Sequence, residues 1–367
     1  MAISKIEIAF TSAIILAASL AFLGLTQKPK FGVADRGDWK TANQQNVTVQ
    51  TEAWIQNPSR VTVNYSDVSI SYRAILNGVI LVEGKRKGIS IKKGNQTKTI
   101  ESKLIHSRIP EWWARHIRNG EKSDLQIPLS VKAKTGPATI PFHAIVYTDT
   151  VETDLISVMD QAVKNTQGKY NIGTEIAGYE TGPQIEVEDG AAEWGQTTPE
   201  MTNMLIDLEI RNPNSYPIPV PGLAGDVQMN QVKLLEWENS RTEMISGPQD
   251  RTIAPGETEE LTFRVTMDND KIDDWFLSHV KQNESTQAQL NMRMVFEIQD
   301  QRIELPPEGI NCDFSFQTAI LEDQNSSSNF QGCSNPTLTQ EETQNQTDEE
   351  AEENQSIVNE TVGGVLG

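Results

Sequence analysis

Hydrophobic and polar residues alternate along most of this 367-residue chain, and that period of two predicts β-strands. The alternation is clearest in residues 47–51, 68–72, 125–131 and 290–298. Asn77-Gly78, which stands between two hydrophobic runs, predicts a tight hairpin. Short strands with turns every 8–12 residues or so predict antiparallel β-sandwich architecture.

A short helical pattern interrupts the strands once in each half of the chain. Spacings of three and four residues place five side chains on one helix face, as is typical of a helix packed on a core. The same pattern returns 163 residues later. The two sets are Ile109, Trp112, Trp113, His116 and Ile117, and Ile272, Trp275, Phe276, His279 and Val280.

A second landmark is also repeated. Trp39 precedes Asn57-Pro58 by 18 residues, and Trp194 precedes Asn212-Pro213 by the same 18. Two landmarks in the same order indicate a duplicated domain. We therefore predict an all-β protein with two tandem antiparallel β-sandwich domains of the immunoglobulin or fibronectin kind, each with one short helix. The expected divisions are an anchor at 1–30, a first sandwich at 31–156, a connector at 157–184, a second sandwich at 185–321 and an acidic disordered tail at 322–367.

The stretch from Ile8 to Leu25 contains 18 residues and no charge. As a helix it would be about 27 Å long, close to the thickness of the hydrocarbon core of a bilayer. We expect a single N-terminal transmembrane helix. The alternative is a cleaved signal peptide, with Ser19-Leu20-Ala21 as a small-x-small cleavage site.

The side of the membrane on which the body lies is indicated by conflicting signals. The basic residues that follow the apolar stretch favour a cytoplasmic body. Cys312 and Cys333 could close one disulfide loop, which would persist only outside the cytosol, although two free thiols are the alternative. Eight glycosylation sequons also favour the outside, so we expect a membrane-anchored, extracytoplasmic body. The sequons lie at Asn46, Asn64, Asn95, Asn283, Asn325, Asn345, Asn354 and Asn359.

The net charge of −20 is unevenly distributed. Residues 31–150 contain 17 Lys and Arg against 10 Asp and Glu, whereas residues 303–367 contain 13 acids and no base. Residues 335–367 have too few large apolar side chains to offset the entropy of ordering, which predicts disorder. A nucleic-acid partner is not expected, because the basic residues at 85–87 and 92–93 are typical of a solvated hairpin.

No catalytic, cofactor-binding or metal-binding residue is predicted. The chain has no nucleophile elbow, zinc-binding helix or phosphate-binding glycine loop. We expect His116 and His279 to pack beside the tryptophans, each bonded through one nitrogen to a backbone carbonyl. Glu121 and Glu284 follow beyond the helix ends and offer no evident second metal ligand. His106 and His143 are solitary, and the acidic run 268–270 is typical of a solvated turn.

The order of these motifs resembles the LEA14-like proteins, the type 2 late-embryogenesis-abundant group with the water-stress and hypersensitive-response (WHy) domain. The resemblance covers residues 47–132 and 202–300, and the anchor, tandem units and acidity look like archaeal members. It implies an antiparallel β-sandwich with a small helix, no catalytic centre and a role in desiccation or osmotic stress. Repeat one departs from repeat two by having Ser59-Arg60 after its Asn-Pro, where the second has Asn214-Ser215.

These observations predict a non-enzymatic, membrane-anchored protein that responds to desiccation or osmotic stress by physical protection, without a cofactor. Its expected partner is the membrane. The alternative is a lipid- or protein-binding module or scaffold at the cell surface, in which a cleft between sandwich and helix would admit an apolar ligand such as a lipid chain.

Overall fold

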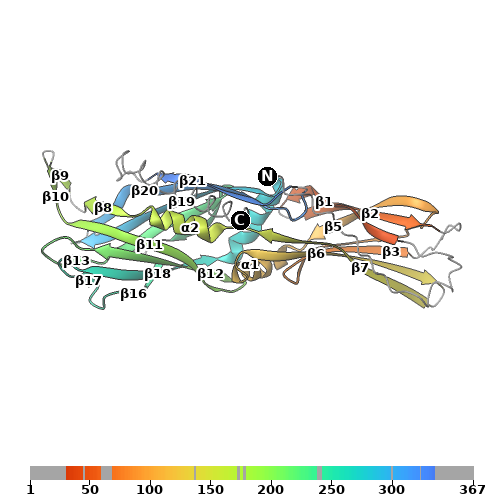
Figure 1. Ribbon diagram of the computed structural model, residues 1–367, viewed down its shortest axis with the longest axis horizontal. Helices are drawn as coiled ribbons and strands as arrows, with labels where there is room; N and C mark the ends of the chain where they lie inside the picture. The colour runs from red at the N-terminus through yellow and green to blue at the C-terminus, as the bar shows by residue number, and fades with distance from the viewer. Residues whose placement is uncertain are drawn as a thin grey trace, which may run out of the picture.

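A computed structural model describes residues 30–43, 46–58, 68–135, 138–171, 174–176, 179–237, 242–298, 301–322 and 324–334. Strands make up most of these residues, which confirms the all-β prediction. The molecule is elongated, with one repeat at each end and the helices α1 (Ile109–Arg118) and α3 (Ile272–Lys281) near the middle (Figure 1).

Repeat one is built from seven antiparallel strands in the order β1-β2-β5-β4-β3-β6-β7. Its core lies between the β1-β2-β5 part and the β4-β3-β6-β7 part, which are joined where Val82 pairs with Leu104. The strands are β1 (Lys30–Asn43), β2 (Asn46–Asn57), β3 (Val68–Leu76), β4 (Val79–Lys87), β5 (Gly94–Leu104), β6 (Lys122–Thr135) and β7 (Ala138–Glu152).

Repeat two has the same arrangement, divided into two sheets with the orders β16-β18-β12-β11-β8 and β15-β14-β19-β20-β21. The strands β11, β12, β14, β15, β18, β19 and β20 correspond in order to β1 through β7. Three further strands, β8, β16 and β21, extend the sheet edges. The main strands are β11 (Gln184–Thr197), β12 (Met201–Arg211), β14 (Gly222–Met229), β15 (Val232–Trp237), β18 (Thr258–Asp268), β19 (Ser285–Ile298) and β20 (Gln301–Gln317); the added ones are β8 (Gly168–Asn171), β16 (Thr242–Ser246) and β21 (Ser327–Ser334).

The remaining elements are short. Two hairpin-like pairs, β9 with β10 and β13 with β17, lie outside the main sheets. One 3-10 turn precedes each of α1 and α3. These elements are β9 (Thr174–Ile176), β10 (Tyr179–Thr181), β13 (Ile218–Pro219), β17 (Thr252–Ile253), η2 (His106–Arg108) and η3 (Asn269–Lys271).

The hairpin between β3 and β4 is tied to the rest of the repeat by its asparagine. Asn77 has a positive φ of 47°, which asparagine tolerates, and its side-chain amide donates to the carbonyl oxygen of Lys122. Asn230 (φ 50°) does the same in repeat two by donating to the carbonyl oxygen of Ser285. The sequence signal therefore predicts both the hairpin and its attachment to the strand after the helix.

Two of the predicted divisions need correction. The segment 157–184 was expected to be a connector, but α2 (Leu155–Lys164) packs on β11 and β8 extends the same sheet. The segment 322–367 was expected to be disordered, but residues 327–334 form β21. Cys312 and Cys333 are register partners on β20 and β21 and form a disulfide, which holds this polar strand on the sheet edge. Residues 335–367 lie outside the described part of the chain.

Within the described ranges, none of the helices is long and apolar enough to cross a membrane. The predicted anchor, Ile8 to Leu25, falls among residues that the structure does not describe.

Candidate functional site

The repeated helices α1 and α3 pack against each other between the two repeats. The Trp112 ring lies 5.3 Å from the Phe276 ring, and the Trp113 ring lies 5.5 Å from the Trp275 ring. Because Trp112 corresponds to Trp275 and Trp113 to Phe276, the two contacts are equivalent. The repeats are therefore related by an approximate two-fold axis between the helices, as two copies are in a symmetric dimer.

A chain of hydrogen bonds runs through the histidine of repeat one. The indole of Trp112 donates to the Ser123 hydroxyl (2.9 Å), which lies 2.9 Å from His116 Nδ1. His116 Nε2 lies 2.8 Å from the Thr153 hydroxyl, which donates to the Glu121 carboxylate (2.7 Å). The chain joins the helix to β6 and to the end of β7.

These partners determine the proton position on His116. The Thr153 hydroxyl gives its hydrogen to Glu121, so it accepts from Nε2–H. The Ser123 hydroxyl already accepts from Trp112, so it donates to Nδ1. The ring is neutral in this arrangement, and burial lowers the pKa of His116 to about 4.

Repeat two contains the same hydrogen-bond chain. Trp275 donates to the Thr286 hydroxyl (3.0 Å), which lies 2.8 Å from His279 Nδ1. His279 Nε2 lies 2.8 Å from Thr318, whose hydroxyl donates to Glu284 (3.0 Å). Complete burial lowers the pKa of His279 to about 3. Both nitrogens of each histidine bond to hydroxyls, and this corrects the expected single bond to a backbone carbonyl.

Glu121 and Glu284 have the role that the sequence reasoning missed. Each follows its helix at a positive φ, 58° and 56°, which turns the carboxylate back beneath the helix end. Glu121 accepts from the backbone N–H groups of Leu155 (2.6 Å) and Ile156 (2.7 Å). Glu284 accepts from the equivalent N–H groups of residues 320 (2.5 Å) and 321 (2.7 Å). Each carboxylate thus fixes the chain that leaves the last strand of its repeat.

The remaining donor to each glutamate comes from the other repeat. Trp39 of β1 donates its indole N–H to Glu284 (2.9 Å), and Trp194 of β11 donates to Glu121 (2.9 Å). The tryptophan that opens each repeat therefore completes the buried carboxylate of its neighbour. The repeat spacing in the sequence contained all four residues, but it did not show that the bonds cross between repeats.

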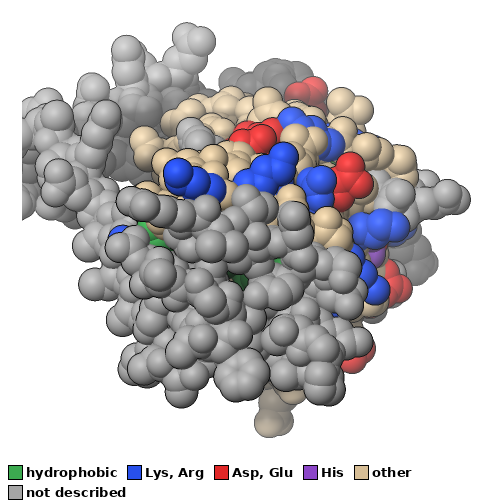
Figure 2. Space-filling view, turned by 90° about the vertical axis from the view of Figure 1, so that its right-hand side faces the viewer, with side chains coloured by type: hydrophobic (Ala, Val, Ile, Leu, Met, Phe, Trp, Pro, Cys, Tyr) green, Lys and Arg blue, Asp and Glu red, His purple; other side chains and the backbone are tan. Residues whose placement is uncertain are grey.

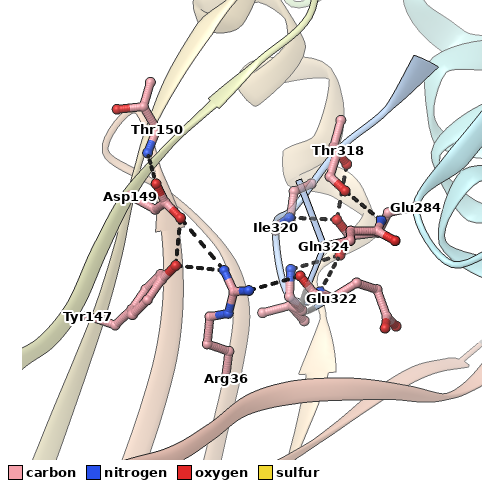
Figure 3. A network of polar contacts seen from close by, with 10 residues as sticks. Arg36, Tyr147, Asp149, Thr150, Glu284, Thr318, Ile320, Glu322 and Gln324 are labelled. Carbon is pink, nitrogen blue, oxygen red and sulfur yellow. Dashed lines mark hydrogen bonds and ion pairs between the residues drawn. The ribbon is translucent and has the colours of Figure 1, made fainter. Parts of the chain in front are cut away.

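Arg36 adds a contact without a repeated counterpart. Its guanidinium donates to the Tyr147 hydroxyl (2.6 Å) and to the carbonyl oxygen of Glu322 (2.9 Å), and it lies 3.7 Å from Asp149 (Figure 3). Figure 3 shows these groups beside the Glu284 carboxylate, where β1, β7 and the segment after β20 meet. Arg36 therefore joins both edges of the first sheet to repeat two.

The other motif residues also have structural roles. Asn212 is fully buried and donates to the carbonyl oxygens of Tyr216 and Ile253, which closes the loop after β12. Asn57 is equally buried and pairs in register with Gly94 on β5. Pro58 and Pro213, which follow the two asparagines, are exposed.

The histidines and the acidic turn outside this network also bond within the protein. His106 bonds to Asp273 of the other repeat (2.8 Å), and His143 bonds to Ser130 (2.7 Å). The acidic run 268–270 is not a fully solvated turn, because Asn269 is buried and donates to the carbonyl oxygen of Thr198 (2.9 Å).

The serine–histidine–glutamate series resembles a hydrolase constellation, but it lacks access to a substrate. Ser123 and its counterpart Thr286 are both 0% exposed, and each hydroxyl already accepts an indole N–H. Among the described residues, no group of three or more His, Cys, Asp or Glu could hold a metal ion. The arrangement is suited to holding helices, strands and repeats together.

An apolar cavity lies beside this centre, between the sheets of repeat two. Its volume of about 30 Å³ has room for one or two water molecules, so it does not admit a lipid chain as described. Flexible methionines make up a third of its lining. The lining residues include Trp113, Trp194, Met159, Met204, Met229 and Met267.

Comparisons with known proteins fit this description. A protein from Archaeoglobus fulgidus of known crystal structure is 24% identical, with 36% of this chain and 97% of that chain covered and a TM-score of 0.30. A calcium-binding mutant of β-glucuronidase 2 from Bacteroides uniformis is 7% identical over 79% of this chain and 33% of that chain, with a TM-score of 0.21. These scores are too low to carry an argument, and no curated protein matches in sequence. Residues 53–144 match the family described as late embryogenesis abundant protein, which supports a protein of that type.

Proposed function

We propose that this protein is a non-enzymatic, membrane-anchored protein of the late-embryogenesis-abundant type that protects cells physically when water is lost. The observation that carries the proposal is the family match over residues 53–144. These residues include α1, His116 and Glu121 of repeat one, and repeat two contains the same hydrogen-bond network. The water-stress role suggested for the matched part is therefore extended to the tandem unit.

The surface of repeat two supports a role that depends on retained water. Asp189, Glu209 and Glu260 lie side by side across β11, β12 and β18. Like charges on neighbouring strands repel one another unless water and counter-ions screen them. A surface of this kind holds a hydrated, ion-rich layer around the protein.

We propose Ile8 to Leu25 as the anchor and place the body outside the cytoplasm. The uncharged length suits a bilayer span. The disulfide between Cys312 and Cys333 supports an oxidising compartment, since such bonds are rare in the cytosol. The anchor would keep the hydrated body close to the membrane and its neighbouring proteins.

Drying a labile test enzyme with the full chain in bilayers tests this proposal. We expect the enzyme to retain more activity than it does with an equal mass of an unrelated acidic membrane protein. A variant with Asp189→Asn, Glu209→Gln and Glu260→Gln should protect less, because it lacks three neighbouring charges of the hydrated surface. Equal protection by the unrelated protein would contradict the proposal.

A further inference from the structure

The end of repeat one that lies far from the helices is basic. We define the basic tip as the eight described bases around the far ends of β1, β4, β5 and β6: Lys30, Lys85, Arg86, Lys87, Lys92, Lys93, Lys98 and Lys132. The register places these ends together, since Lys30 pairs with Gln56 next to Asn57, which pairs with Gly94. Figure 2 looks onto this end and shows Lys and Arg side chains gathered on its described part.

The charges of the basic tip are not neutralised within the protein. The described segments 30–34, 53–58, 68–72, 85–98 and 129–132 contain no Asp or Glu. Arg86 donates to the carbonyl oxygen of Thr99, but none of the eight bases is ion-paired with a described carboxylate. By contrast, Arg211 pairs with Glu186 and Lys233 pairs with Glu236 in repeat two.

The chain enters the folded body at this same tip. β1 begins at Lys30, and the apolar stretch of the sequence ends five residues earlier at Leu25. Five residues span at most about 17 Å. If the apolar stretch is anchored in a bilayer, the basic tip is held within roughly two Debye lengths of the headgroups at physiological ionic strength.

We propose that the basic tip docks on anionic lipid headgroups of the membrane that holds residues 8–25; this inference rests on the anchor of the proposed function. Lysine and arginine clusters next to a membrane-spanning segment are attracted to negatively charged lipids. The chain's own acidic tail is less favoured as the occupant, because it follows β21 in the other repeat. Docking by the tip directs the long axis away from the bilayer, with acidic repeat two outermost (Figure 1).

The test uses the full chain in vesicles of phosphatidylcholine, with or without about one-third phosphatidylglycerol. Both native cysteines are in the disulfide, so one introduced cysteine can be labelled without reduction. Thr97→Cys places a donor fluorophore at the tip, and Ser246→Cys places one on repeat two; both positions are exposed. Energy transfer to a labelled lipid headgroup reports how close each position lies to the membrane.

We expect transfer from position 97 to rise about twofold with the anionic lipid and to fall again at high salt, because the attraction is electrostatic. Transfer from position 246 should stay low in both vesicles. The variant K87Q/K92Q/K93Q should lose the rise. The charge-matched control K233Q/K271Q/K281Q, which removes three exposed lysines of repeat two, should keep it.

The two proposals fail in different ways. A chain that does not float with pure phosphatidylcholine vesicles lacks the anchor and contradicts that part of the proposed function. A chain that floats but gives the same transfer from position 97 in both vesicles overturns docking by the basic tip. Displacement of the tip from anionic vesicles by duplex DNA at physiological salt, or a salt-dependent change at position 97 without lipid, would also overturn it, in favour of a nucleic acid or the acidic tail.

Discussion

The two repeats share an interior and differ in their surfaces. Trp112, His116 and Glu121 in repeat one have the same bonds as Trp275, His279 and Glu284 in repeat two, to within a few tenths of an ångström. The only exchange within the two hydrogen-bond chains is Ser123 for Thr286, which keeps the hydroxyl.

The surfaces, in contrast, have opposite charge. The far end of repeat one presents unpaired lysines, whereas repeat two presents a row of carboxylates across β11, β12 and β18. Since the fold depends on the shared interior, the surface charges were free to diverge. The comparison indicates that the interior holds the tandem unit together and that the surfaces determine what it contacts.

The largest expected effect is the loss of the buried carboxylate of repeat two. Glu284→Ala leaves two backbone N–H groups and the Trp39 indole without an acceptor, so we expect it to lower the free energy of unfolding by about 3–5 kcal/mol. Urea unfolding of the full chain measures this. Glu236→Ala, at an exposed ion pair with Lys233, is the control and should cost less than about 1 kcal/mol. Equal costs would show that the buried glutamate is not special.

The bonds that cross between repeats should contribute less, because each involves one donor. Trp39→Phe and Trp194→Phe each remove one indole N–H from a buried carboxylate, and we expect each to cost about 1.5–3 kcal/mol. A double-mutant cycle of Trp39→Phe with Glu284→Gln should show coupling, whereas Trp194→Phe with Glu284→Gln should be additive. Coupling in neither pair would contradict the reciprocal arrangement.

The histidines predict how stability depends on pH. Burial lowers the pKa of His116 to about 4 and that of His279 to about 3, from 6.5 when exposed. The unfolded chain therefore binds more protons below pH 6.5, and stability falls as the pH falls from about 6.5 towards these values. We expect each histidine to contribute a slope of about 1.4 kcal/mol per pH unit at most.

Chemical denaturation at pH 7, 6 and 5 measures that slope. His279→Gln should be less stable than the unchanged protein at pH 7 but should show a shallower decrease towards pH 5. The same change at exposed His143, which bonds to Ser130, is the control and should leave the slope unchanged. A slope unaffected by His279→Gln would mean that carboxylates alone cause the acid sensitivity.

The smallest expected effect is on the surface of repeat two. Glu209 lies between Asp189 and Glu260 on neighbouring strands, so Glu209→Gln should stabilise the protein by about 0.2–1 kcal/mol at low salt. Molar salt should remove most of this gain through screening. A gain that persists in high salt would have a cause other than charge repulsion.

Much of the fold could be predicted from local sequence. The alternation of residues 290–298 predicts β19, Asn77-Gly78 predicts the hairpin, and the 109–117 pattern predicts α1. Each of these signals depends on neighbours in the chain. The strand β21 was missed because its polar residues carry no alternation, and its place depends on pairing with β20.

The site was less predictable because its bonds join distant residues. Glu121 lies beyond the helix end in sequence, and nothing local shows that Leu155 and Trp194 donate to it. The equal spacing of both tryptophans and both glutamates in the repeats was visible. A single sequence, however, does not distinguish a bond within one repeat from a bond between two.

The crossing of Trp39 to Glu284 and of Trp194 to Glu121 also limits how this gene can change. If one repeat were deleted or moved into another protein, it would leave behind a buried carboxylate missing a donor and a tryptophan missing its acceptor. Both halves must therefore be inherited together, and the smallest unit that recombination can transfer intact is the pair.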